Sequence, residues 1–313
     1  MSPIDEATRR LRPSEAEATR AWQTLVDEHL ALMDRVGGPR PTGDVWAPMV
    51  DRFRPSDGAP DPESAVLAAL AEPGDTWLDI GAGGGRFAVP LARAVRRVVA
   101  IEPSAAMRGV LRESIAAAGR SNVAVLDVSW PPDEPPDAST GDPAIRTAEV
   151  ALAANVLYGV PDIAAFLDAM EGDAMEGDAK EGRPAGGSGR RLCVAVLGDR
   201  GRGPLWPPVW AGLYEEQQTV LPGVREFVAL LGARDRRYDL RTVTLPRPLP
   251  VEAPRAQRLA RRLLRVEEGT PRDRRLAELL AEHYGTGDGR VLLPSRRRYN
   301  AIISWEPAPP PER

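Results

Sequence analysis

The chain has 313 residues, of which 42% are hydrophobic, and a formal net charge of −4. This length suits one large α/β domain with additions or two small domains, and the charge gives no general electrostatic reason to bind nucleic acid. The single cysteine, Cys193, excludes an internal disulfide, a cysteine zinc site and an iron–sulfur cluster, and we expect no metal. Residues 1–13 lack the apolar core of a signal peptide, and no apolar stretch approaches the ~20 residues that span a bilayer. We therefore expect a cytoplasmic protein without a membrane partner.

Helices are predicted before the first strand. Ser14 and Glu17 have the spacing of a capping box, and apolar residues then recur at helical spacing as far as the glycines at 37 and 38. Two shorter helices are expected over residues 44–53 and 61–71. Together they make residues 1–72 an N-terminal helical extension, which either caps the rest of the chain at its ligand site or only packs against it.

The next stretch predicts a buried strand, a glycine turn and a helix. Residues 76–80 are mostly apolar, four of the five residues that follow are glycine, and residues 87–95 have apolar side chains at helical spacing. Glycine lacks the Cβ that would keep other groups away from the backbone. A helix start adds unpaired N–H groups and a positive dipole end. This turn is therefore predicted to bind a ligand with polar or anionic groups.

The spacing of the glycines narrows the choice of ligand. The dinucleotide pattern G-x-G-x-x-G fits Gly81 and Gly83, but its sixth position is Arg86, where a small residue is expected. The pattern present is Asp79-x-Gly81-Ala82-Gly83-x-Gly85. It resembles motif I of the class I, seven-stranded S-adenosylmethionine (SAM)-dependent methyltransferases. That resemblance implies SAM as cofactor, bound by these residues, and a doubly wound, mostly parallel α/β sheet.

An acidic residue also ends the second predicted strand, over residues 97–101. A carboxylate at the position of Glu102 can accept hydrogen bonds from both ribose hydroxyls of a nucleoside. Dinucleotide-binding proteins use the same arrangement, so Glu102 indicates a ribose without saying which cofactor carries it. Pro103 follows, Ser104 caps a helix as far as residue 118, and Met107 of that helix faces inward. We place Pro103 and Met107 beside the cofactor.

The third strand, over residues 122–126, is followed by Asp127 and Val128. In the resembling family an acidic residue here holds the adenine amino group, and the next backbone N–H meets a ring nitrogen. The resemblance thus assigns Asp127 and Val128 to the cofactor. Aspartate after a strand is also common turn chemistry, which leaves a purely structural reading open.

Residues 148–154 form the fourth predicted strand, and residues 155–158 (Asn-Val-Leu-Tyr) follow it. This is similar to motif IV of the small-molecule methyltransferases of types 11 and 25. The Asn-Pro-Pro-aromatic type of signature that marks adenine- and amide-methylating enzymes is absent. The resemblance assigns Asn155 to the cofactor. Tyr158 is the best-placed polar group for orienting an acceptor, since a phenol titrates near ~10 and is a poor base at neutral pH.

A tandem pentapeptide within residues 170–190 follows, and its composition predicts a flexible surface loop. The fifth strand, residues 191–197, contains Cys193 as a buried small residue. Trp206, Trp210 and Tyr214 then recur at i, i+4 and i+8 and form one aromatic stripe on a helix. Ligands of open α/β sheets bind beyond the carboxyl ends of the strands, so the stripe is either a substrate wall or core packing.

After a helix over residues 224–231, residues 236–245 predict a sixth strand. The resemblance implies a seventh strand antiparallel to it, and residues 299–305 are the best candidate. We therefore divide the chain into the extension, a core over 73–250, a helical insert over 251–296 that is a possible lid, and a last strand and tail over 297–313. The arginines of the insert form either a solvated basic face or a surface for an acidic substrate or RNA.

The function implied is transfer of a methyl group from SAM to a small-molecule acceptor by in-line displacement. The enzyme's main work is then alignment and exclusion of water. Two alternatives remain: an RNA or protein methyltransferase, and a non-catalytic module that binds SAM or NAD.

Overall fold

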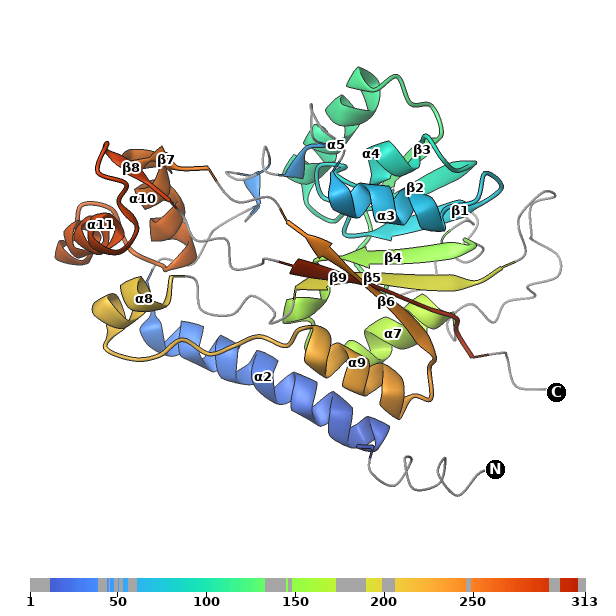
Figure 1. The fold of residues 1–313 in the computed structure, drawn as a ribbon, viewed down its shortest axis with the longest axis horizontal. Helices are drawn as coiled ribbons and strands as arrows, with labels where there is room; N and C mark the ends of the chain where they lie inside the picture. Colours follow the sequence, from blue (N-terminus) through green and yellow to red (C-terminus); the bar gives the residue numbers. More distant parts are fainter. Residues whose placement is uncertain are drawn as a thin grey trace.

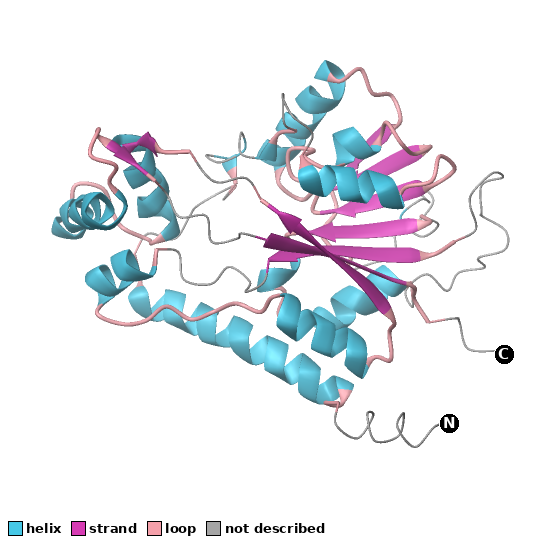
Figure 2. Cartoon of the chain, viewed as in Figure 1, coloured by secondary structure: helices cyan, strands magenta, loops and turns pink. Residues whose placement is uncertain are grey.

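The computed structural model describes residues 12–38, 44, 46–47, 50, 53–55, 61–132, 145, 148–172, 190–198, 206–245, 249–292 and 299–308. Within these residues, helices cover both faces of a seven-stranded sheet (Figures 1 and 2). The predicted doubly wound α/β fold is confirmed. The sheet consists of β1 (Thr76–Ile80), β2 (Arg97–Ile101), β3 (Val123–Leu126), β4 (Val150–Ala154), β5 (Leu192–Gly198), β6 (Tyr238–Thr244) and β9 (Tyr299–Trp305).

The strand order is β3-β2-β1-β4-β5-β9-β6. The first five strands are parallel, and β9 lies antiparallel between β5 and β6, as expected for a returning seventh strand. The chain fills one half of the sheet outward from β1 and then crosses to β4. The switch point therefore lies between the carboxyl ends of β1 and β4, where open α/β sheets bind their ligands.

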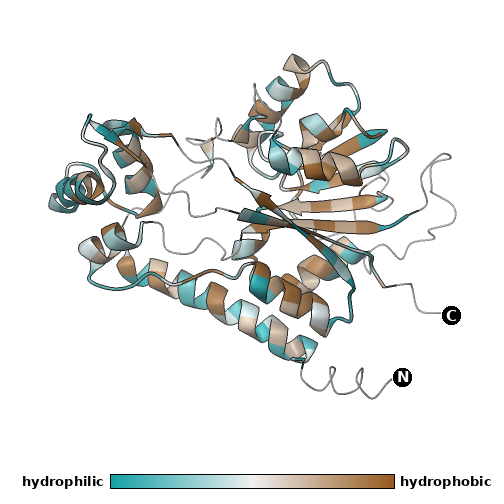
Figure 3. Cartoon of the chain, in the orientation of Figure 1, coloured by the Kyte–Doolittle hydropathy of each residue, from teal (hydrophilic) through white to brown (hydrophobic). Residues whose placement is uncertain are grey.

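Each face of the sheet has its own hydrophobic core. On one face α2 (Glu15–Val36), α7 (Ile163–Glu171) and α9 (Val224–Ala233) pack on residues such as Leu78 and Ile303. On the other, α3 (Pro62–Leu70), α4 (Ala88–Leu91) and α5 (Ala105–Ala117) pack on residues such as Trp77 and Val194. The central strands β4 and β5 are almost wholly apolar because both of their faces are covered (Figure 3).

Some predicted elements differ from the structure. The helix expected over residues 87–95 is only Ala88–Leu91, because tight turns follow it at once: Arg93 donates to the Pro90 carbonyl and Ala94 to that of Leu91. The helix expected over 44–53 lies partly outside the described residues. The repeat loop lies almost wholly outside them, since residues 173–189 are not described.

The insert consists of α10 (Ala253–Leu263), α11 (Pro271–Tyr284) and a small ribbon of β7 (Val251–Glu252) and β8 (Arg290–Val291). It packs with α8 (Pro207–Tyr214) and the end of α2 around a third apolar cluster that includes Leu32, Trp210 and Leu279. Strand β6 runs parallel to β5, since both are antiparallel to β9. The insert therefore leaves the sheet at the carboxyl edge, as Figure 1 shows. None of the helices in the described ranges is long and apolar enough to cross a bilayer.

Candidate cofactor site

The glycine turn joins β1 to α4 at the switch point. Gly81, Gly83 and Gly85 have φ values of +72°, +56° and +92°, which side chains rarely adopt. A Cβ on Gly81 would lie 2.5 Å from Cγ1 of Val156, which follows β4. The turn after β1 therefore contacts the segment after β4 so closely that only glycine fits.

The Glu102 carboxylate, directly after β2, connects this turn to the next helix. One of its oxygens accepts a hydrogen bond from the Gly83 N–H, and the other accepts one from the Ser104 N–H, both at 2.8 Å. Glu102 is only 6% exposed. Burial raises the pKa of Glu102, and the two hydrogen bonds act in the opposite direction. The predicted ribose-binding residue thus lies against the predicted ligand-binding turn.

Asp79, in β1, supplies a second buried carboxyl group to the same site. The backbone N–H of Ala88 donates to it, but its Oδ2 atom has no hydrogen-bond partner among the described residues. Burial, and secondly the charge of Glu102, raise the pKa of Asp79 to about 7. An unpaired buried carboxyl oxygen beside another acid favours a ligand that carries positive charge or hydrogen-bond donors.

Replacing this carboxyl group should change how stability depends on pH. The pKa of Asp79 is higher in the folded protein than its usual value of 3.8, so between pH 4 and 7 the unfolded chain loses the proton first and wild-type stability falls as pH rises. The Asp79→Asn variant lacks this loss. Its stability relative to wild type should therefore increase by up to ~1.4 kcal/mol per pH unit and level off above pH 7. Urea unfolding of both proteins at pH 5, 6, 7 and 8 measures this difference, and a constant difference would contradict the assignment.

Asp127 follows β3, as predicted, and forms an ion pair with Arg108 of α5. Both carboxylate oxygens accept hydrogen bonds from the guanidinium, at 2.7 and 2.6 Å. Arg108 also donates to the carbonyl oxygens of Glu102 and Pro103. Arg108 therefore fixes the loops after β2 and β3 relative to each other, and nothing in the sequence singled it out. Contact of Asp127 with an adenine remains a prediction.

The remaining residues assigned to the cofactor surround these loops. Pro103 is exposed, Met107 is buried in α5, and Val128 is half-buried after β3. Asn155 follows β4 with a left-handed φ of 61°, and its N–H donates to the Val196 carbonyl. Ala82, the non-glycine residue within the turn, is buried.

Tyr158 lies in a short 3₁₀ helix, Leu157–Gly159, after β4, and is 2% exposed. Its hydroxyl accepts a hydrogen bond from the Gly198 N–H at 2.7 Å and donates to the side-chain oxygen of Asn155 at 3.3 Å. In this structure the hydroxyl therefore connects the carboxyl ends of β4 and β5. Its role toward an acceptor remains a prediction.

Parts of the N-terminal extension lie directly on the glycine turn. A Cβ on Gly84 would lie 2.7 Å from the carbonyl oxygen of Phe53, and one on Gly83 would lie 3.6 Å from the Phe53 Cβ. Asp44 accepts hydrogen bonds from the Ser104 hydroxyl and the Ala106 N–H at the start of α5. Both contacts join positions far apart in the chain, so no local pattern predicts them.

The aromatic stripe lies inside the third apolar cluster. Trp206 and Trp210 are 2% and 0% exposed, and the ring centres of Trp210 and Tyr214 are 4.5 Å apart. Tyr214 donates its hydroxyl to the Leu264 carbonyl, and the Arg272 guanidinium lies over its ring. In this structure the stripe joins α8 to the insert, and any contact with a substrate remains a prediction.

Residues 51–171 match a family model described as a methyltransferase domain, which confirms the resemblance that the sequence predicts. A comparison with the curated proteins gives no match. Among solved structures, the YcgJ protein from Bacillus subtilis is 12% identical with a TM-score of 0.47, covering 79% of this chain and 98% of its own. A SAM-dependent methyltransferase from Geobacter sulfurreducens in complex with S-adenosyl-L-homocysteine is 16% identical with a TM-score of 0.44, and the match covers 84% of this chain and 96% of that one. The [4+2]-cyclase SpnF is 15% identical with a TM-score of 0.45, and the match covers 95% of this chain and 98% of that one.

Proposed function

We propose that this chain, which contains a methyltransferase domain over residues 51–171, transfers a methyl group from SAM to a small-molecule acceptor. The observation that carries the proposal is the hydrogen bond from the Gly83 N–H to the Glu102 carboxylate. It brings a carboxylate that could accept from ribose hydroxyls against the glycine turn at the switch point. SAM supplies a methyl group on a sulfonium, which is already a good leaving group.

The charges of the site support SAM over a dinucleotide. Asp79 and Glu102 are two buried acids beside the turn, and the orphaned Asp79 oxygen suits a ligand with cationic groups such as SAM better than one with a pyrophosphate. Arg86, at the sixth position of the dinucleotide pattern, is engaged by two carboxylates of the chain itself. It is held by Asp61 at 2.7 Å and by the buried Glu63.

The chain's own residues would align the reactants and keep water away. The backbone of the glycine turn and Glu102 hold the nucleoside, and Phe53 covers Gly83 and Gly84. Tyr158 and the residues after β4 orient the acceptor. The insert, which leaves the sheet at the same edge, is the candidate lid. Transfer by in-line displacement needs mainly this alignment and a dry site.

The arginines argue against an RNA methyltransferase. That alternative needs the arginines of residues 234–298 to gather beside the site. Arg234 and Arg236 instead bind Glu171 at the amino edge of the sheet, the opposite side from the glycine turn. Other arginines of this range have acidic partners: Arg241 with Asp239, Arg261 with Asp273, Arg275 with Glu278 and Arg290 with Glu252. Fewer charges are thus left for a phosphate backbone.

Calorimetric titration of the full chain with SAM, S-adenosylhomocysteine and NAD tests the proposal. We expect micromolar binding of the first two compounds and no binding of NAD. Binding of NAD alone would refute the cofactor assignment. Binding of the SAM pair without methyl transfer to any of a panel of small-molecule hydroxyl, amine and carboxylate acceptors would favour the non-catalytic alternative.

A further inference from the structure

Strand β6 is an open edge of the main sheet. It is the last strand in the order and pairs with β9 on one side only within the described residues. Six of its seven residues are exposed, and Val243 alone is buried. Every second residue of such a strand directs its N–H and C=O away from the sheet. Natural edges are usually protected by charged side chains, proline or a bulge. The strand β6 (Tyr-Asp-Leu-Arg-Thr-Val-Thr) has no lysine or proline, and its two charged residues are of opposite sign.

The two faces of β6 differ in character. Tyr238 and Leu240 share the face of Ile303 and Trp305, and they are 42% and 37% exposed. Asp239 and Arg241 lie on the opposite face, where they form an exposed ion pair at 3.0 Å within the strand. The edge thus has an apolar pair on one face and one charge of each sign on the other.

We propose that β6 pairs with β6 of a second copy of this chain, antiparallel about a two-fold axis at Leu240. In that register Asp239 of each copy lies opposite Arg241 of the other, and the two Leu240 side chains meet on the apolar face. Tyr238 lies opposite Thr242 of the other copy. The sheet then continues through both copies, and the contact is isologous, as two-fold dimers require.

The charges select this register over its neighbours. An axis at Asp239 would place two aspartates opposite each other, and an axis at Arg241 would oppose two arginines. Like charges directly opposite each other destabilise a strand pair, while opposite charges stabilise it. A change of register by one residue is also excluded, because it would place residues from the two different faces of β6 opposite each other. The Leu240 axis makes two ion pairs at once, which favours a second copy over an unrelated strand.

Charge exchange tests both the partner and the register. Sedimentation equilibrium of the wild-type chain is expected to show a dimer. Asp239→Arg and Arg241→Asp should each raise the dimer dissociation constant by roughly tenfold to a hundredfold, because each turns two ion pairs into two like-charge contacts. An equimolar mixture of the two variants restores both ion pairs and is expected to dimerise. Arg275→Asp, which changes an exposed ion pair on α11, serves as the charge-matched control and should dimerise as wild type does.

Three results would overturn the proposal. One is a wild-type chain that stays monomeric at every concentration tested. Another is a dimer that tolerates both single substitutions, which would place its interface elsewhere. The third is a mixture of the two variants that stays monomeric although each is folded by circular dichroism. The substituted side chains are 60% and 49% exposed, so both variants are expected to fold.

Discussion

Replacing Glu102 with alanine is expected to raise the dissociation constant for S-adenosylhomocysteine about tenfold to a hundredfold. If Glu102 binds the cofactor as we propose, the variant loses the acceptor for two ribose hydroxyls, and hydrogen bonds to a charged group contribute ~1.5–3 kcal/mol each before relaxation. It also releases the N–H groups of Gly83 and Ser104, which the carboxylate holds in the free protein. The loss therefore includes both direct contact and the shape of the turn. Isothermal titration of the full chain measures it.

Two further variants separate these contributions. Glu102→Gln keeps the side chain's shape and one carbonyl acceptor but removes the charge, so its affinity should lie between those of wild type and Glu102→Ala. Glu113→Ala removes an exposed carboxylate from the neighbouring helix α5 and should leave affinity unchanged. Thermal melting of each variant checks that the fold is intact. Wild-type affinity in a folded Glu102→Ala protein would remove Glu102 from the site.

The sequence predicts the parts of this site that depend on local pattern. The glycine turn, Glu102 and Asp127 each follow a short apolar strand, and parallel strands bring their carboxyl ends to one edge of the sheet. The antiparallel position of residues 299–305 came from the family resemblance, and the structure confirms it. The glycine turn, Glu102 and Asp127, by contrast, are encoded within a few residues of their own strand ends.

Contacts between distant segments were not predictable in this way. Asp44 at the start of α5, Phe53 on Gly84 and Arg108 on Asp127 depend on how separate elements pack. The length of α4 depends similarly on the turns that return the chain to β2. Helical periodicity in the aromatic stripe correctly predicted α8, but periodicity does not tell which neighbour the stripe contacts. That neighbour is the insert.

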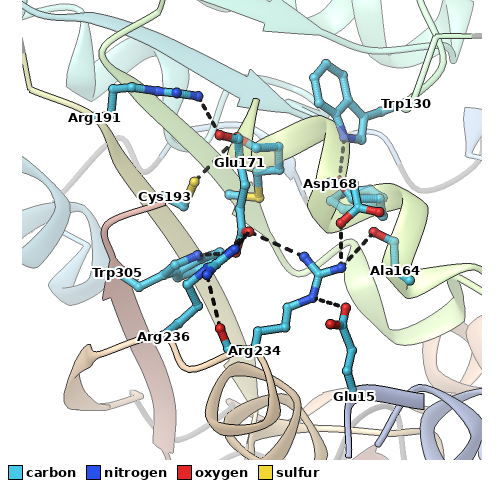
Figure 4. A network of polar contacts seen from close by, with 12 residues as sticks. Glu15, Trp130, Ala164, Asp168, Glu171, Arg191, Cys193, Arg234, Arg236 and Trp305 are labelled. Atoms are coloured by element: carbon cyan, nitrogen blue, oxygen red, sulfur yellow. Dashed lines mark hydrogen bonds and ion pairs between the residues drawn. The ribbon is translucent and has the colours of Figure 1, made fainter. Parts of the chain in front are cut away.

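At the amino ends of the parallel strands, opposite the glycine turn, Glu171→Ala is expected to destabilise the fold by about 3–5 kcal/mol. Glu171 ends α7, and its carboxylate accepts hydrogen bonds from Arg236, from the Trp305 indole at 2.9 Å and from Arg234 (Figure 4). The side chains of Glu171 and Arg234 are 2% and 4% exposed. Alanine would leave two arginines without this shared partner in a largely dry site, and the loss of a buried partner costs more than the pair itself contributes.

Glu15 provides the control for the effect of burial. Its carboxylate lies 2.8 Å from the same Arg234, but its side chain is 48% exposed. Because water screens an exposed partner, Glu15→Ala should cost less than ~1 kcal/mol. Urea unfolding at pH 7 measures both variants against wild type. A Glu171→Ala loss as small as that of Glu15→Ala would show that solvent or relaxed arginine side chains replace the carboxylate. A large loss confined to Glu171 would identify it as the residue that joins α7, α9, β6 and β9, and so holds the sheet on which the cofactor site is built.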